Sequence, residues 1–417
     1  MKSKLITLLL LAALVFGAGA QAKEIRVLVA NHPYGDLLKQ YIPEYEKATG
    51  VKVNVESLQE SQLTTKLTTE FATNSSSADV FMTRPLQEGK MFYKNGWYEP
   101  LTSYDFSDYP ESAMGVARFG NKPYLVPLVT EWQVLYYRKD LFKKAGLSVP
   151  RTFAELEAAA KALDSTDISG FASRGKGAAA VTQLSSYVYN YGGKYLDKGV
   201  AVFDSKEALD AIRFYGKLLA LYGPTGVTSM SWENIMPLFQ AGKVAMWTDA
   251  SVFFGQIVDP AKSQVTAADV GIANLPAGPK ASNPFFVVSW GMAVARQSKN
   301  KAQAMDFIKW ATSADLAKKA LGGASIPMSR NSAWADPAVV AKANPELVAS
   351  QAFAAKNGNP FDRPYMSAVG NARDLIGEVI IESINTAGTS QKLADLAKQK
   401  VKQVNELLED TGEYGMY

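Results

Sequence analysis

The residues that usually carry covalent or metal chemistry are scarce in this sequence. There is no cysteine, and the only histidine is His32. A zinc site, a cysteine nucleophile or a Cys–His pair is therefore not expected, and neither is a bound metal or other cofactor. A Ser-His-Asp triad would have to use His32, and no nucleophile elbow surrounds it.

A stretch of a different character runs over residues 120–142, GNKPYLVPLVTEWQVLYYRKDLF. Its two extended runs, 124–129 and 134–137, flank the polar and aromatic pair Glu131 and Trp132. Prolines in and just before the first run favour an edge or crossing segment over a central strand. The stretch separates two halves with an α/β pattern, so a hinge here would place the pair at the mouth of an interdomain cleft.

The first half alternates strands with helices. The expected strands are 25–30, 51–55 and 78–83, and the expected helices are 36–49, with Pro43 as a kink or a late start, and 59–72. This order predicts a parallel sheet with right-handed crossovers. Ligands bind beyond the carboxyl ends of such strands. That rule singles out residues 31–34, 58–61 and 83–84.

The same alternation resumes in the second half. Helices are expected from 152 onward and at 206–222, 232–241, 300–312, 372–385 and 392–408, strands at 243–247, 269–275 and 285–295, and irregular structure at 321–330. The last strand has Ser289, Trp290 and Gly291 in its middle, where a glycine indicates close backbone approach.

The N-terminus has the pattern of a secretory signal peptide. Lys2 and Lys4 precede an apolar run and the small-residue site Ala20-Gln21-Ala22, so cleavage is expected after residue 22. Without a cysteine there is no lipoprotein anchor, and we expect a free periplasmic protein. Loss of the two lysines lowers the formal net charge from +4 to +2. A nearly neutral chain without basic runs does not predict nucleic-acid binding.

Several segments, taken in order, resemble the extracellular solute-binding proteins of sugar-importing ABC transporters, the maltose-binding-protein-like family. They are AGKVAMW at 241–247 with the following Thr-Asp-Ala-Ser, LPAGP at 275–279, SWGMAVARQSKNKAQAMDFIKWATS at 289–313, residues 322–330, and RPYMSAVGNARDLIGEVI near the C-terminus. The resemblance implies an α/β, two-lobed periplasmic-binding-protein fold of the type II-like kind, with discontinuous lobes joined by a multi-segment hinge. Residues 23–128 and 278–330 would form the N-terminal lobe, and residues 129–277 and 331–417 the C-terminal lobe. It also implies a monomeric carrier, not an enzyme, that delivers its ligand to ABC permease subunits.

The Asp and Ser after the Met-Trp strand, and the later Ser-Trp-Gly, resemble the branch that binds monosaccharides or sugar alcohols. Such a ligand needs carboxylates that accept from its hydroxyl groups, guanidinium groups that donate to them, and aromatic faces for its C–H surface. The residues expected to bind it are Asn31, His32, Tyr34, Arg84, Glu131, Trp132, Trp232, Asp249, Trp290, Gly291 and Arg330.

Several of these residues also have a structural interpretation. The alternatives are a helix cap for Asp249, an interlobe salt bridge for Arg330, hinge structure for Glu131, a solvated turn for Arg84, a surface position for Trp232 and a loop position for His32. Trp247 and Trp310 are expected in the core.

The size of the ligand is indicated near the C-terminus. Val369, Gly370 and Asn371 occupy the region where oligosaccharide-binding members carry a stacking aromatic residue, which favours a small ligand. An acidic sugar is an alternative ligand because two arginines are expected near the cleft. The rival functions are a secreted glycoside hydrolase that uses Asp249 and Glu131 as its carboxylates, a carrier of a non-carbohydrate solute, and a carrier that also docks to a chemoreceptor.

Overall fold

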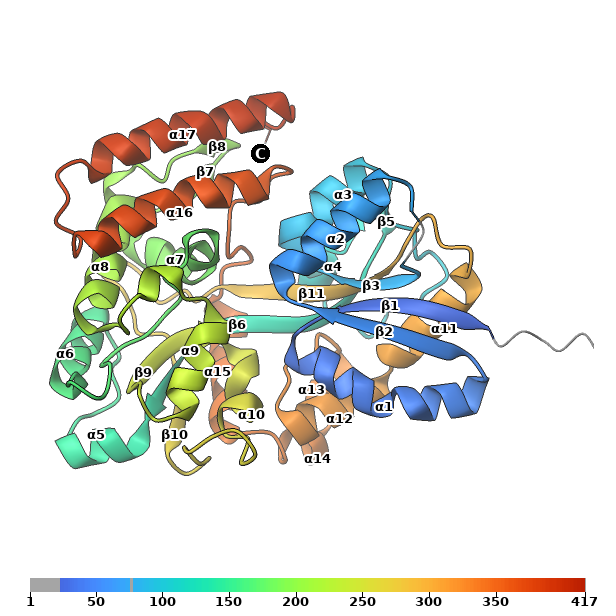
Figure 1. Ribbon diagram of the computed structural model, residues 1–417, viewed down its shortest axis with the longest axis horizontal. Helices are drawn as coiled ribbons and strands as arrows, with labels where there is room; N and C mark the ends of the chain where they lie inside the picture. The colour runs from blue at the N-terminus through green and yellow to red at the C-terminus, as the bar shows by residue number, and fades with distance from the viewer. Residues whose placement is uncertain (1–22, 76–77, 417) are drawn as a thin grey trace, which may run out of the picture.

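The structure is a computed structural model that describes residues 23–75 and 78–416, so the expected leader peptide lies outside the described residues. Figure 1 shows two lobes of helices and strands, joined by the long strands β6 (Val126–Arg138) and β11 (Phe286–Val294). The predicted two-lobed α/β fold is confirmed. Within the described ranges, no helix is long and apolar enough to cross a membrane.

A parallel sheet lies at the centre of the first lobe. Strand β1 (Glu24–Ala30) lies between β2 (Lys52–Leu58) and β3 (Val80–Thr83), and α1 (Pro33–Thr49) and α2 (Glu60–Ala72) are the crossovers. The strand–helix alternation predicted from the sequence is therefore confirmed. Helix α1 begins earlier than expected because the His32 side chain caps it and a proline suits its first position. Pro43 lies inside this helix and does not mark its start.

Strand β6 runs from one lobe into the other and lies in the interior of the sheet. The order is β10-β6-β11-β3-β1-β2, and β9 also pairs with β6. The prediction of a crossing segment is confirmed, but the prediction of an edge, with two separate runs, is wrong. A proline fits here because Pro127 lies opposite Gly291, where the register of β11 shifts and the ladder is already interrupted.

The second lobe is mainly helical. Its strands are β9 (Met246–Ala250) and β10 (Val270–Asn274), with the short pair β7 (Leu196–Asp197) and β8 (Val200–Ala201). Its helices are α5 (Lys139–Ala145), α6 (Phe153–Leu163), α7 (Gly177–Tyr191), α8 (Lys206–Tyr222), η2 (Val227–Ser229), α9 (Trp232–Gln240), η3 (Ser251–Phe253), α10 (Phe254–Ile257), α15 (Pro345–Asn357), α16 (Val369–Asn385) and α17 (Leu393–Asp410). Helices α7 and α15 were not expected from the sequence, and β9 begins three residues later than predicted.

The remaining elements lie with the first lobe (Figure 1). They are η1 (Pro85–Gly89), α3 (Lys90–Lys94), α4 (Glu111–Met114), β4 (Arg118–Phe119), β5 (Lys122–Pro123), α11 (Lys301–Ala311), α12 (Ala314–Ala324), α13 (Asn331–Trp334) and α14 (Pro337–Val340). Residues 321–324, expected to be irregular, form the end of α12. Helices α13 and α14 lie beside α12, although the predicted boundary assigned residues from 331 onward to the other lobe. Asp108 holds α13 there, because it accepts hydrogen bonds from Arg330 and Ser332.

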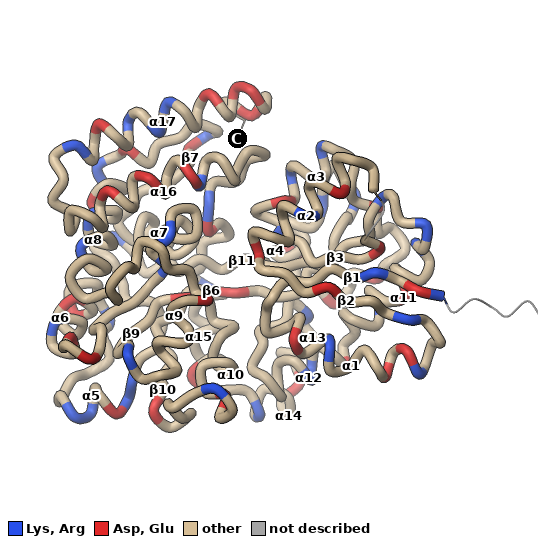
Figure 2. The backbone as a smooth tube through the Cα atoms, in the orientation of Figure 1, with Lys and Arg blue, Asp and Glu red and all other residues tan. Residues whose placement is uncertain are grey.

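Charged residues of both signs are interspersed over the two lobes (Figure 2). Many form surface pairs one helical turn apart, such as Lys206 with Asp210. Pairs of this kind contribute little to stability. Most of the charged side chains that are withdrawn from water lie instead between the lobes.

Candidate functional site

A cavity lies between the lobes, where the carboxyl ends of β1 and β3 meet β6 and β11. This is the edge at which parallel α/β sheets bind ligands. The lining side chains approach one another closely and leave a free volume of about 30 Å³. Both lobes and the crossing strands line it: His32, Glu60, Arg84, Glu131, Arg174, Thr182, Ala250, Phe253, Phe285, Val287, Ser289, Trp290, Asp362 and Arg363.

Arg84 follows β3 and dominates the first-lobe wall. Its guanidinium donates to Glu60 Oε2 at 2.8 Å and to Glu88 Oε1 at 2.7 Å, and it lies 5.4 Å from the centre of the Trp290 ring. Burial raises the pKa of Glu60, but the Arg84 guanidinium and the arginines of the opposite wall lower it, to about 2. Glu60 is therefore a carboxylate at neutral pH and can accept hydrogen bonds.

His32 joins the first lobe to the crossing strand β6. Its Nδ1 accepts from the Tyr34 backbone N–H at 3.1 Å, so the ring hydrogen is on Nε2. Nε2 in turn donates to Glu131 Oε1 at 3.0 Å. The ring also lies 5.7 Å from the Trp290 ring. The imidazole thus orients both Glu131 and one edge of the cavity.

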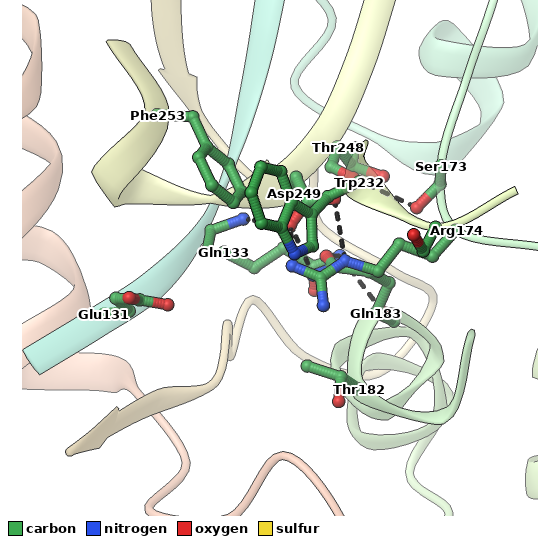
Figure 3. A network of polar contacts seen from close by, with 12 residues as sticks. Glu131, Gln133, Ser173, Arg174, Thr182, Gln183, Trp232, Thr248, Asp249 and Phe253 are labelled. Atoms are coloured by element: carbon green, nitrogen blue, oxygen red, sulfur yellow. Dashed lines mark hydrogen bonds and ion pairs between the residues drawn. The ribbon is translucent and has the colours of Figure 1, made fainter. Parts of the chain in front are cut away.

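Arg174 dominates the second-lobe wall (Figure 3). The buried Asp249 carboxylate on β9 accepts from its Nε at 3.0 Å and its Nη2 at 2.5 Å. The same carboxylate accepts from Gln183 Nε2, Trp247 Nε1 and the Ala250 N–H, at 2.8–3.2 Å. Burial raises the pKa of Asp249, and the Arg174 guanidinium counteracts it. Asp249 does not line the cavity; it orients Arg174, which does.

The loop before α16 supplies a third charged pair. Arg363 Nε donates to Asp362 Oδ1 at 2.7 Å, and both side chains line the cavity. Arg363 Nη1 reaches the first lobe and donates to Gln87 Oε1 at 2.8 Å. Thr182 on α7 lies beside this pair, 3.3 Å from Arg363 Nη2.

Aromatic rings close the cavity on one side. Phe253, which lines it, is stacked between Trp232 at 4.9 Å and Trp247 at 5.6 Å. Trp232 belongs to the second lobe, yet its Nε1 donates to Glu60 Oε1 of the first lobe at 3.1 Å. This hydrogen bond spans the gap between the lobes beside the cavity.

The structure brings together part of the predicted site. His32, Arg84, Glu131 and Trp290 line the cavity. Trp232 and Asp249 lie directly behind it, bonded to Glu60 and Arg174. Asp249 is part of β9 and not a helix cap. Direct contact of any of these side chains with a ligand stays a prediction.

The other five predicted residues lie away from the cavity. Asn31 accepts a hydrogen bond from Ser57 on the surface, and the buried Tyr34 hydroxyl donates to the Ala311 carbonyl. The Trp132 Nε1 donates to Ser350, and Gly291 packs against Leu125. Arg330 binds Asp108, Tyr104 and the Thr312 carbonyl. Arg330 has all these partners in the first lobe, so it is not an interlobe salt bridge.

Several lining residues were absent from the predicted set. Glu60 falls in the strand-end segment 58–61, and Arg363 begins the C-terminal segment on which the family resemblance rests, so each had a signal in the sequence. Arg174 and Asp362 lie in loops without a pattern, and only the fold brings them to the cavity.

The charges around the cavity balance. The lining carries three carboxylates, Glu60, Glu131 and Asp362, and three guanidinium groups, Arg84, Arg174 and Arg363. Over the part of the chain that the structure describes, no cluster of three or more His, Cys, Asp or Glu is placed to hold a metal ion. The arrangement provides fixed donors and acceptors and suits a polar ligand without net charge.

Comparison with known proteins places this geometry in context. Residues 30–318 match the family described as bacterial extracellular solute-binding protein. The mannitol-binding protein of Pseudomonas aeruginosa is 31% identical over 270 residues, a match that spans 61% of each chain. The erythritol/L-threitol-binding protein of Mycolicibacterium smegmatis is 28% identical over 73% of this chain and 69% of that protein. A solved ABC transporter solute-binding protein from Agrobacterium radiobacter K84, in complex with ribitol, is 28% identical with a TM-score of 0.81, covering 92% of this chain and 98% of the other.

Proposed function

Because this chain belongs to the bacterial extracellular solute-binding protein family, we propose that it captures a small, uncharged sugar alcohol and delivers it to the permease of an ABC importer. The similar proteins named for mannitol and for erythritol, and the structure with ribitol, support this class of ligand. All three ligands are short, uncharged carbon chains that carry hydroxyl groups.

The observation that carries the proposal is the pairing of charges around the cavity. Each lining arginine faces a protein carboxylate: Arg84 faces Glu60, Arg174 faces Asp249, and Arg363 faces Asp362. An acidic sugar would therefore find no unmatched cation among the described lining residues. A neutral polyol can instead donate to the carboxylates and accept from the guanidinium edges, while its C–H groups pack on Trp290 and Phe253.

Capture proceeds by closure of the lobes. A ligand held by one wall provides hydroxyl groups that the other wall can bind. It therefore stabilises the closed arrangement, in which both walls contact the ligand. The hydrogen bond from Trp232 to Glu60 forms in the same arrangement and links the two lobes. The permease would then recognise the surfaces that the closed lobes present together.

Binding occurs without turnover in this proposal. A glycosidase would need two carboxylates flanking a bond in the ligand. Asp249 stands behind Arg174, outside the cavity lining, and five donors surround it. The protein acts as a free periplasmic monomer after removal of its leader peptide.

Titration calorimetry on the mature protein, unfolded and refolded to remove bound solute, tests the proposal. The panel is D-mannitol, ribitol and erythritol, with D-gluconate as a charged analogue and maltose as a larger sugar. We expect saturable binding of at least one polyol and none of gluconate. A polyol at 100 times its Kd should add about 2.7 kcal/mol of stability. Binding of gluconate alone, or of no polyol by a protein with a cooperative thermal transition, would overturn the ligand class.

A further inference from the structure

A second set of contacts joins the lobes at a seam between η1–α3 of the first lobe and the segments 363–373 and 411–413 of the second. In Figure 1 the blue helix α3 lies across from the C-terminal end of the chain. Lys90 Nζ on α3 lies 3.0 Å from Glu413 Oε1, donates to the Tyr365 carbonyl at 2.9 Å, and lies 4.1 Å from the centre of the Tyr365 ring. Neither Lys90 nor Glu413 lines the cavity.

Both partners of this ion pair are withdrawn from water. The side chains of Lys90 and Glu413 are 11% and 4% exposed. Glu413 also accepts from the Ser367 N–H at 2.7 Å. Burial raises the pKa of Glu413, but the Ser367 N–H and the Lys90 ammonium lower it, to about 2. Separation of the lobes would remove the Lys90 ammonium from this carboxylate.

Gln87 makes a second contact across the same seam. Its Oε1 accepts from Arg363 Nη1 at 2.8 Å and from Arg373 Nη1 at 2.5 Å. Arg373 is 7% exposed, and its Nε has no acceptor within reach among the residues described. One amide oxygen of the first lobe thus serves two guanidinium groups of the second, and opening would remove it from both.

We propose that these contacts, made by Gln87 and Lys90 with Arg363, Arg373 and Glu413, form a latch that sets the balance between open and closed lobes before any ligand binds. The inference rests on the proposed hinge closure. Contacts that cross from lobe to lobe exist only when the lobes are together, so they stabilise the closed state relative to the open state. Ligand affinity scales with the fraction of closed protein. Gln87, Lys90, Arg373 and Glu413 do not line the cavity, so these four members of the latch tune affinity without touching the ligand.

Distance measurement between spin labels tests the latch directly. The chain has no cysteine, so Glu111→Cys on α4 and Lys206→Cys on α8 label one exposed site on each lobe. In this background, Lys90→Met and Glu413→Gln should each raise the open-to-closed ratio about tenfold, because each removes the buried Lys90–Glu413 ion pair that crosses between the lobes. The apparent Kd for D-mannitol should rise by the factor by which the closed fraction falls. Lys301→Met is the control, since it removes an ion pair with Glu99 inside the first lobe.

The outcomes separate the latch from the function on which it rests. A labelled parent that shows the same single distance with and without D-mannitol contradicts hinge closure itself. The other outcome is a parent that opens and closes, with Lys90→Met and Glu413→Gln showing the same distances and the same Kd as Lys301→Met. That result overturns the latch and leaves the proposed function standing. Circular dichroism on each variant verifies that the lobes remain folded.

Discussion

Arg84 and Arg174 face the same cavity from opposite lobes, but they are held in different ways. Arg174 is fixed by Asp249, which is fully buried on β9 and receives donors from the second lobe alone. Arg84 is held within its own lobe by the buried Glu88, and also by Glu60, whose side chain is 26% exposed and whose other oxygen binds the opposite lobe. We infer that the second wall is preformed, whereas the first wall is completed when the lobes close.

The largest effect is expected in the preformed wall. Asp249→Ala leaves Arg174 buried without its carboxylate, and loss of one partner of a buried ion pair costs about 3–5 kcal/mol. Urea unfolding of the ligand-free protein should show this loss, and polyol binding should disappear with it. Glu60→Gln, the matched change in the first wall, should cost far less because that side chain is partly hydrated.

A double variant separates stability from binding at this wall. Arg174→Met with Asp249→Leu removes both charges, and apolar replacement of a buried ion pair is often neutral or stabilising. Stability should therefore return toward that of the parent while polyol binding stays absent. Recovery of binding together with stability would show that Arg174 is not a ligand donor.

The next effect tests the completion of the first wall. Trp232→Phe keeps the ring that stacks on Phe253 but removes the Nε1–H donated to Glu60. A hydrogen bond to a charged group contributes about 1.5–3 kcal/mol. We expect polyol affinity to fall about tenfold with little change in unliganded stability. Trp310→Phe, at a partly buried ring that packs against the core of the first lobe, is the control, and an equal loss in both variants would refute the comparison.

The contrast between the walls also explains what could be predicted from the sequence. The first lobe follows a local pattern: strands of β-branched residues, amphipathic helices and a polar residue directly after each strand. That pattern indicated His32, Arg84 and the segment with Glu60. These residues come from consecutive strand ends, which a parallel sheet brings together by rule.

The second wall has no such local signal. Arg174 lies in a loop, and its role depends on Asp249, more than seventy residues later in the sequence. Asp362 and Arg363 reach the cavity only because α16 packs in the second lobe. Tyr34, Trp132 and Arg330 have the types expected of a site, yet their polar atoms bond within the protein. Residue type identified candidates, and long-range packing decided which of them face the cavity.

A smaller effect is expected at His32, which caps α1 and orients Glu131. His32→Asn restores an N-cap but not the hydrogen bond to Glu131, whereas His32→Ala loses both. The cap contributes about 1 kcal/mol. Thermal unfolding should therefore separate the alanine variant from the asparagine variant, while calorimetry shows weaker polyol binding in both. Parent-like affinity in His32→Asn would mean that the orientation of Glu131 does not matter.

The smallest effect near neutral pH concerns the charge of Glu60. Its pKa falls from 4.5 to about 2 in the folded protein, where burial opposes and the surrounding arginines favour the carboxylate. A lowered pKa contributes stability that is complete above pH 4.5 and disappears as the pH falls toward 2. Between pH 8 and 5 we expect no change from this group. Below pH 4.5, Glu60→Gln should lose less stability than the parent in urea unfolding, because it has no carboxylate to protonate. Glu111→Gln, at an exposed carboxylate of the same lobe, should follow the parent. If Glu60→Gln also follows the parent, the arginines do not hold the first wall through Glu60, and the two walls differ less than their contacts indicate.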